Sequence, residues 1–212
     1  MRHDEATRRA VEAERRDLAD LLDRLAPADW DAGSLCADWT VRDVVAHLTL
    51  ATRLSRRAAV LGVLRARGDV NRMIGDAARR RAAEYEPGEL VAQLRATAGS
   101  ARRPLGTQPL DPLVDLLVHG QDIARPLGRV RQMPADRVLP ALDHVWRSSF
   151  YGTRRRFAGL RLVATDVDWS AGEGGEVRGP GGELLLVMTG RAAGLGGLHG
   201  PAAAEVAARL RA

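Results

Sequence analysis

The chain has 212 residues, which is enough for one large domain or for a larger and a smaller one. It contains no lysine and only 4% aromatic residues, and its formal net charge is +5. The densest basic stretch, residues 53–81, has no interleaved aromatics to stack on bases, so a solvated helix face explains it better than a nucleic-acid site. No apolar run approaches the roughly 20 residues of a membrane span, and the charged opening is unlike a signal peptide. The single cysteine, Cys36, allows no internal disulfide and fits a reducing cytoplasm. Together these features lead us to expect a cytoplasmic protein that binds neither nucleic acid nor membranes.

Apolar residues recur at helical spacing through the first two-thirds of the chain. Two helix starts are marked by their sequence. Thr40 with Asp43 three residues later forms a variant of the capping box, and Asp111 before Pro112 is typical of an N-cap followed by proline at the first helical position. The pattern predicts helices over residues 4–26, 40–50, 70–84, 87–103, 111–125 and 135–150.

The composition changes after residue 150. Residues 161–169 alternate and are rich in β-branched side chains, as in a strand, and residues 176–182 indicate a second short strand and turn. Residues 183–190 favour a short helix closed by Gly190, and a terminal helix is expected from residue 201 to 211. The sequence therefore predicts an α+β protein with a helical bundle over residues 1–152 and a small α+β domain over residues 153–212.

Three residues have the chemistry of a metal site. Asp115 and His119 are four residues apart on one predicted helix, so their side chains share a face and can bind one ion together. His47 borders the apolar stripe of another helix and can supply the third ligand. Two histidines and one carboxylate leave coordination positions open for water or substrate. The spacing alone is equally compatible with a hydrogen-bonded core histidine.

Three ordered motifs are similar to those of the mycothiol-dependent maleylpyruvate isomerase family, and together they extend over nearly the whole chain. They are Trp39-Thr-Val-Arg-Asp-Val-Val-Ala-His-Leu48, His119-Gly-Gln-Asp-Ile-Ala-Arg-Pro-Leu-Gly128 and Gly179-Pro-Gly-Gly-Glu-Leu-Leu-Leu-Val-Met-Thr-Gly-Arg191. The resemblance implies a DinB-like four-helix bundle followed by a small domain resembling sterol carrier protein.

The same resemblance implies a divalent metal, usually zinc, held at the positions of His47, Asp115 and His119. The family's well-described isomerases have glutamate where this chain has the shorter Asp115. The thiol cosubstrate would be mycothiol, the small thiol of actinobacteria, and Arg191 at the end of the third motif would bind thiol or substrate carboxylates. Arg191 could instead only bridge the two domains.

The chemistry follows from the ligand set. A metal ion with open positions can deprotonate a bound thiol. The thiolate can then add to an electrophilic double bond, allowing cis–trans isomerisation, or displace a leaving group, giving an S-transferase. Two alternatives remain open, namely metal-assisted hydrolysis on the same fold and a non-catalytic binding protein.

Two further residues have a sequence interpretation. Asp122 could accept a hydrogen bond from the other ring nitrogen of His119, or pair with Arg125 or Arg42 on the surface. Cys36 has no activating neighbour in its local sequence, so we expect a structural role for its thiol.

Overall fold

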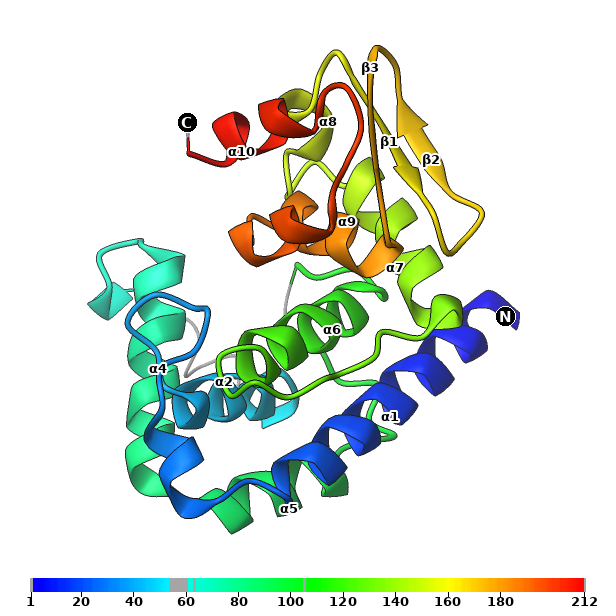
Figure 1. Ribbon diagram of the computed structural model, residues 1–212. Coiled ribbons are helices and arrows are strands. Elements are labelled where there is room, and N and C mark those ends of the chain that lie inside the picture. The colour runs from blue at the N-terminus through cyan, green and yellow to red at the C-terminus, as the bar shows by residue number, and fades with distance from the viewer. Residues whose placement is uncertain (1, 54–60, 63, 105, 212) are drawn as a thin grey trace. The chain divides into compact units, whose positions relative to one another are not determined.

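The computed structural model describes residues 2–53, 61–62, 64–104 and 106–211 (Figure 1). It divides into two compact units, Met1–Arg131 and Gln132–Ala212. Among the described helices, none has the length and apolar character needed to span a membrane. The expected domain boundary between residues 152 and 153 falls inside the second unit. It stays a prediction, because a domain boundary is tested by which piece folds on its own.

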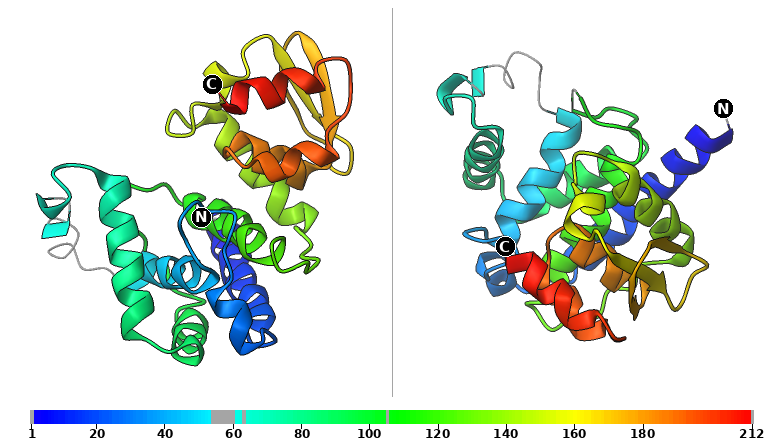
Figure 2. Two further views of the ribbon diagram at one scale, coloured as in Figure 1. Left: turned by 60° about the vertical axis from the view of Figure 1, so that its left-hand side comes forward. Right: turned by 90° about the horizontal axis from the view of Figure 1, so that it is seen from above.

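The first unit is helical. Its elements are α1 (Arg2–Leu22), the 3₁₀ turn η1 (Pro27–Asp31), α2 (Val41–Arg53), α4 (Val70–Glu84), α5 (Pro87–Ala96) and α6 (Asp111–Ala124). Four of these helices form a closed ring, because α1 and α2 each pack against both α5 and α6, while α4 lies outside against α2 (Figure 2). This is the four-helix bundle that the family resemblance implies.

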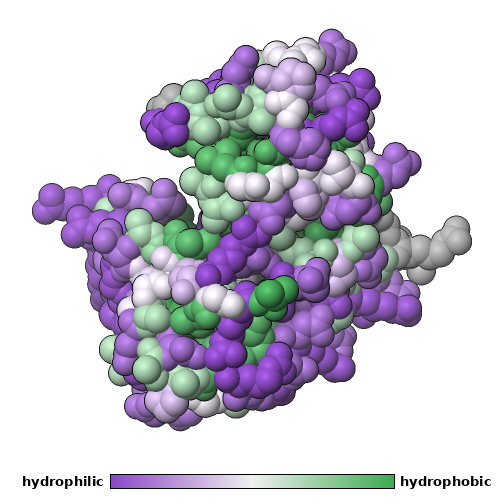
Figure 3. Space-filling view, viewed as in Figure 1, coloured by the Kyte–Doolittle hydropathy of each residue, from purple (hydrophilic) through white to green (hydrophobic). Residues whose placement is uncertain are grey.

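The bundle follows from the apolar stripes of its helices. Leu18, Val44, Leu90 and Leu117, one from each of the four, are fully buried. Most charged side chains face outward, and Figure 3 shows a surface that is mostly hydrophilic, with apolar residues in small groups. This inside–outside division is the hydrophobic pattern expected of amphipathic helices around one core.

The helix starts agree only partly with the expected caps. Thr40 and Asp43 form the reciprocal pair, since Asp43 N–H donates to Thr40 Oγ1 at 3.2 Å and Thr40 N–H donates to Asp43 Oδ2 at 2.9 Å. Asp111 is the first residue of α6 and not its N-cap, which is Leu110. Its carboxylate accepts a hydrogen bond from Gln108 N–H, so it holds the turn that precedes the helix. Two residues of the basic stretch, Arg56 and Arg57, lie outside the described residues.

The second unit combines helices with a small sheet. Its elements are α7 (Ala135–Arg147), α8 (Thr153–Arg156), β1 (Leu160–Ala164), β2 (Ser170–Gly172), β3 (Gly175–Gly179), α9 (Gly181–Met188), η2 (Ala192–Gly197) and α10 (Ala203–Arg211). The sheet order is β2-β1-β3, with β1 antiparallel to β2 and parallel to β3. α9 is almost wholly buried and packs against α7, η2 and β1. The α+β fold class is therefore confirmed.

The strand predicted over residues 161–169 is shorter than expected, because β1 ends at Ala164 and β2 begins only at Ser170. Residues 161–169 turn back on themselves after Ala164, so that Ala164 N–H donates to Trp169 O at 2.9 Å. The turn residue Asp166 accepts a hydrogen bond from Gly181 N–H at 2.7 Å, which caps the start of α9. The alternating pattern does not indicate this turn, because the hydrogen-bond partner of the Asp166 carboxylate lies 15 residues further along the chain.

Candidate metal centre

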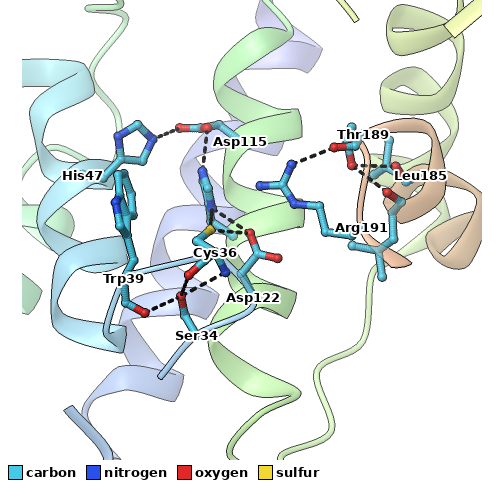
Figure 4. A network of polar contacts seen from close by, with 11 residues as sticks. Ser34, Cys36, Trp39, His47, Asp115, Asp122, Leu185, Thr189 and Arg191 are labelled. Atoms are coloured by element: carbon cyan, nitrogen blue, oxygen red, sulfur yellow. Dashed lines mark hydrogen bonds and ion pairs between the residues drawn. The ribbon is translucent and has the colours of Figure 1, made fainter. Parts of the chain in front are cut away.

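His47, Asp115 and His119 meet inside the first unit. His47 is carried by α2, and Asp115 and His119 are carried by α6, where their four-residue spacing stacks them on one face. Asp115 lies between the two rings (Figure 4). Its Oδ2 is 3.5 Å from His47 Nε2 and its Oδ1 is 3.3 Å from His119 Nε2. All three side chains have ligand atoms within 4.8 Å of one another.

The imidazole rings also contact each other. The His47 and His119 ring centroids are 5.0 Å apart in an edge-on arrangement, and the Trp39 ring centroid lies 5.4 Å from that of His47. His47 Nδ1 is buried and has no hydrogen-bond partner among the described residues. His47 is therefore oriented by ring packing and by its Nε2 contact with Asp115, whereas His119 has polar contacts at both ring nitrogens.

Asp122 contacts the ring nitrogen of His119 that does not face Asp115. Its side chain is fully buried, and its Oδ2 is 2.9 Å from His119 Nδ1. This geometry supports the expected hydrogen bond between Asp122 and the second ring nitrogen of His119. A pairing of Asp122 with an arginine on the surface does not apply, because the carboxylate is fully buried. An Nδ1–H bound to Asp122 leaves Nε2 as the nitrogen that faces Asp115.

The residues between His119 and Asp122 anchor α6 to the rest of the unit. A Cβ on Gly120 would lie 2.4 Å from Arg131 Nε, so glycine makes room for that side chain. Arg131 forms an ion pair with Glu14 of α1, and both side chains are almost fully buried. Gln121 Nε2 donates to the Arg131 carbonyl at 2.8 Å. The His-Gly-Gln-Asp motif therefore combines site residues with packing residues.

Electrostatics in the centre favour a cation. Burial by itself raises the pKa of the Asp115 carboxyl, but the charges of His47 and His119 and hydrogen bonds from both outweigh it and hold that pKa well below its usual range. Burial lowers the pKa of His119, yet the Asp115 charge and hydrogen bonds to Asp115, Asp122 and Cys36 raise it well above its ordinary value. A site that draws a proton onto a buried imidazole is one where a positive ion is stabilised.

Sequence reasoning missed one member of this cluster. Cys36 Sγ lies 3.2 Å from Asp122 Oδ2 and 3.6 Å from His119 Nδ1, and the three side chains form a second group with metal-ligand chemistry. The absence of partners in the local sequence was a poor guide, because both partners come from α6, more than 80 residues later. No local signal distinguishes this cysteine from a structural one.

Arg191 belongs to the second unit. Gly190, with a φ of 89°, ends α9 as predicted, and Arg191 N–H donates back to Leu186 O at 2.8 Å. The Arg191 guanidinium donates from Nη1 to Thr189 O at 2.8 Å, and the side chain is half-buried. Its catalytic and bridging roles both stay predictions.

Known proteins agree with this architecture. The model of the mycothiol maleylpyruvate isomerase N-terminal domain matches residues 11–134, more than half of the chain and all three candidate metal ligands. The chain belongs to this family. Among curated proteins, none matches it.

Two solved structures are similar in fold. A crystal structure of a histidine-to-alanine mutant of the mycothiol-dependent maleylpyruvate isomerase is 15% identical, covers 92% of this chain and 91% of its own, and has a TM-score of 0.58. A second crystal structure of the mycothiol-dependent maleylpyruvate isomerase is 16% identical, with 89% and 90% coverage and a TM-score of 0.55. At these identities the likeness establishes a common fold.

Proposed function

We propose that this protein is a metal-dependent enzyme that uses mycothiol to modify an electrophilic small molecule, by cis–trans isomerisation or by thiol transfer. In this proposal His47, Asp115 and His119 bind one divalent cation, with zinc preferred, and Arg191 binds the carboxylate of the thiol or substrate. Membership of the family supports the thiol cosubstrate, and the geometry of the three ligands supports the metal.

The convergence of two imidazole nitrogens on one carboxylate carries the proposal. Zinc bonds of about 2.0–2.2 Å in a tetrahedral site put neighbouring ligand atoms about 3.4 Å apart. Asp115 Oδ2 lies 3.5 Å from His47 Nε2, and Asp115 Oδ1 lies 3.3 Å from His119 Nε2, so each oxygen is at about that spacing from one of the two nitrogens. The shorter side chain of aspartate is therefore compatible with the role that glutamate has in the well-described isomerases.

The donor set also fits the chemistry. Nitrogen from histidine and oxygen from a carboxylate suit zinc and similar divalent ions, and three protein ligands leave room for a further one. A metal bound there would supply the positive charge that converts a thiol into a nucleophilic thiolate near neutral pH.

The chain's own residues would orient the reaction. Asp115, with its side chain 35% exposed, is the ligand most open to solvent, whereas His119 is held by buried Asp122. This combination gives a site that is accessible to a thiol and rigid on its inner side. Arg191 would bind a carboxylate through the two parallel N–H groups of its guanidinium, restricting how the electrophile approaches.

The direct test measures metal and thiol dependence together. The purified full chain should contain about one equivalent of divalent metal. In the presence of mycothiol, the metal-loaded protein should accelerate the consumption of an unsaturated keto diacid with a cis double bond, or of another electrophile. Glutathione and cysteine should be poor substitutes. Metal without thiol dependence would favour the hydrolytic alternative, and a chain that binds no divalent metal would favour the non-catalytic one.

A further inference from the structure

The loop between η1 and α2 is stabilised by hydrogen bonds within itself. Gly33 and Thr40 form an isolated antiparallel bridge at its ends. Ser34 Oγ donates to Trp39 O at 2.9 Å and accepts from Cys36 N–H at 3.1 Å. Because the loop is closed by hydrogen bonds from both backbone and side chain, its side chains keep fixed directions relative to one another.

The same loop is attached to the end of α6. Leu35 N–H donates to the Asp122 carbonyl at 3.0 Å. This bond brings the next residue, Cys36, alongside the Asp122 side chain, where its sulfur lies 3.2 Å from Oδ2 (Figure 4). Oδ2 is also the oxygen that contacts His119 Nδ1. One carboxylate oxygen is therefore shared between the thiol and the imidazole.

Sharing matters because Asp122 is fully buried. A buried carboxylate needs hydrogen-bond donors to offset the loss of water, and the thiol and the His119 N–H both point at the same oxygen. The sulfur also lies 3.6 Å from Nδ1, so it fills the space beside the ring. Removing the thiol would take away a donor and a packing contact at once.

We propose that Cys36 is a positioning residue for His119, acting through Asp122, and that it thereby raises the metal affinity of the centre. This rests on the proposed metal site. The thiol is a weak donor, so it stabilises the Asp122 charge without displacing the imidazole N–H from the shared Oδ2. Trp39, from the same loop, packs on His47, while Cys36 contacts His119. One hydrogen-bonded loop therefore contacts both candidate histidine ligands.

The test uses Cys36→Ala and Cys36→Ser in the full chain, with Leu35→Ala as a matched control. Leu35 has an exposed side chain, and its backbone bond to Asp122 survives the substitution. Zinc affinity is measured by competition with a chelator. Cys36→Ala should weaken zinc binding about tenfold, the lower end of the loss usual for residues that orient a ligand. Cys36→Ser, which keeps a donor at this position, should recover most of it, and Leu35→Ala should match the wild type.

A second measurement needs no metal. In the zinc-free protein, the hydrogen-bonded Nδ1–H of His119 should give a downfield proton resonance that exchanges slowly in wild type, Cys36→Ser and Leu35→Ala. It should exchange faster in Cys36→Ala. If wild type binds no zinc, the proposed function fails, yet this comparison still decides the role of Cys36.

Two results would overturn the proposal. The first is a Cys36→Ala variant with wild-type zinc affinity and an unchanged Nδ1–H resonance. The second is a wild type that binds two equivalents of zinc, one of them lost in both Cys36→Ala and Cys36→Ser. That pattern would make the Cys36 sulfur a ligand in its own right and not a hydrogen-bonding group.

Discussion

Asp122 contacts Nδ1 of His119 at 2.9 Å, while Nε2 of the same ring faces Asp115 at 3.3 Å. The two carboxylates therefore bind opposite nitrogens of one imidazole. Asp122 is fully buried and suited to orienting the ring, whereas Asp115 is 35% exposed and suited to binding a ligand together with it. The i, i+3 and i, i+4 positions of a single helix are enough to create this division of roles.

Asp122→Asn should test the orienting role. The amide keeps the shape of the side chain but removes its charge, and it can present an N–H instead of an oxygen to Nδ1. We expect zinc affinity to fall about 10- to 100-fold, with the fold retained by circular dichroism. An unchanged affinity would show that His119 is oriented by packing alone.

Asp115→Ala should lose most of the bound metal, because it removes the carboxylate between the two histidines. The fold should persist, since a partly exposed side chain contributes little to packing. Asp115→Glu should keep or improve metal binding, because it restores the residue of the well-described isomerases. Metal content is measured after dialysis, and equal content in wild type and Asp115→Ala would refute the assignment.

The metal-free protein should show a pH dependence set by Asp115 and His119. The raised pKa of His119 contributes stability that is present below about pH 6.5 and lost as pH rises through its folded-state value. The lowered pKa of Asp115 contributes stability that is present above about pH 4 and lost as pH falls through its own folded-state value. The pair therefore stabilises the metal-free fold most between about pH 4 and pH 6.5.

Thermal melting measures this effect and its competition with zinc. Because zinc must displace the His119 proton, added zinc should raise the melting temperature more at about pH 8 than at about pH 6. Asp115→Asn is the matched control, and its zinc-free melting temperature should vary less over this range. A zinc effect of equal size at both pH values would contradict the ligand role of His119.

The sequence predicts some elements well because their determinants are local. α4 spans Val70–Glu84 as expected, since Asp69 accepts a hydrogen bond from Arg72 N–H at its start. The spacing of Asp115 and His119 is likewise a property of one helix. α5, by contrast, ends at Ala96 and not near residue 103. The carbonyls of Thr97 and Ala98, just beyond its end, accept hydrogen bonds from Arg15 of α1, a partner that no local pattern identifies.

The surroundings of the candidate site were less predictable for the same reason. Cys36 meets His119 and Asp122 because the Leu35–Asp122 backbone bond joins a loop to a helix far along the chain. The convergence of His47 on Asp115 came from the family resemblance and not from periodicity, which only indicates that His47 borders an apolar stripe. Contacts between distant segments depend on the complete fold, so sequence pattern limits them without fixing them.

Arg15 should be important for stability and not for chemistry. It is almost fully buried in α1, and its Nη1 donates to the carbonyls of Thr97, Ala98 and Ser100 at 2.9–3.0 Å. Arg15→Met keeps the apolar stem but leaves these carbonyls without their donor. We expect a loss of roughly 2–4 kcal/mol in the free energy of unfolding, measured by urea denaturation. A loss below about 0.5 kcal/mol would mean that water replaces the guanidinium at no cost.

The final prediction concerns Arg191, the residue that the third motif singles out. Its backbone is fixed by Gly190 and by the bond from its N–H to Leu186 O, and its guanidinium already donates to Thr189 O. A guanidinium has five N–H donors in a planar fork, so one backbone contact leaves others able to bind a carboxylate. If Arg191 positions an anionic thiol or substrate, its loss should affect turnover and not metal binding.

Arg191→Ala should therefore retain its metal and lose thiol-dependent turnover by about tenfold or more, the effect expected from one lost positioning contact. Arg191→Lys should recover little, because an ammonium cannot make the two parallel bonds. Arg154→Ala, at an exposed arginine of α8, is the control and should behave as wild type. The bridging role predicts a different pattern, in which Arg191→Ala lowers the melting temperature and Arg191→Lys restores it, with kcat and KM close to wild type at temperatures where the variant is folded. Turnover and melting together thus separate a carboxylate-binding arginine from one that only stabilises the fold.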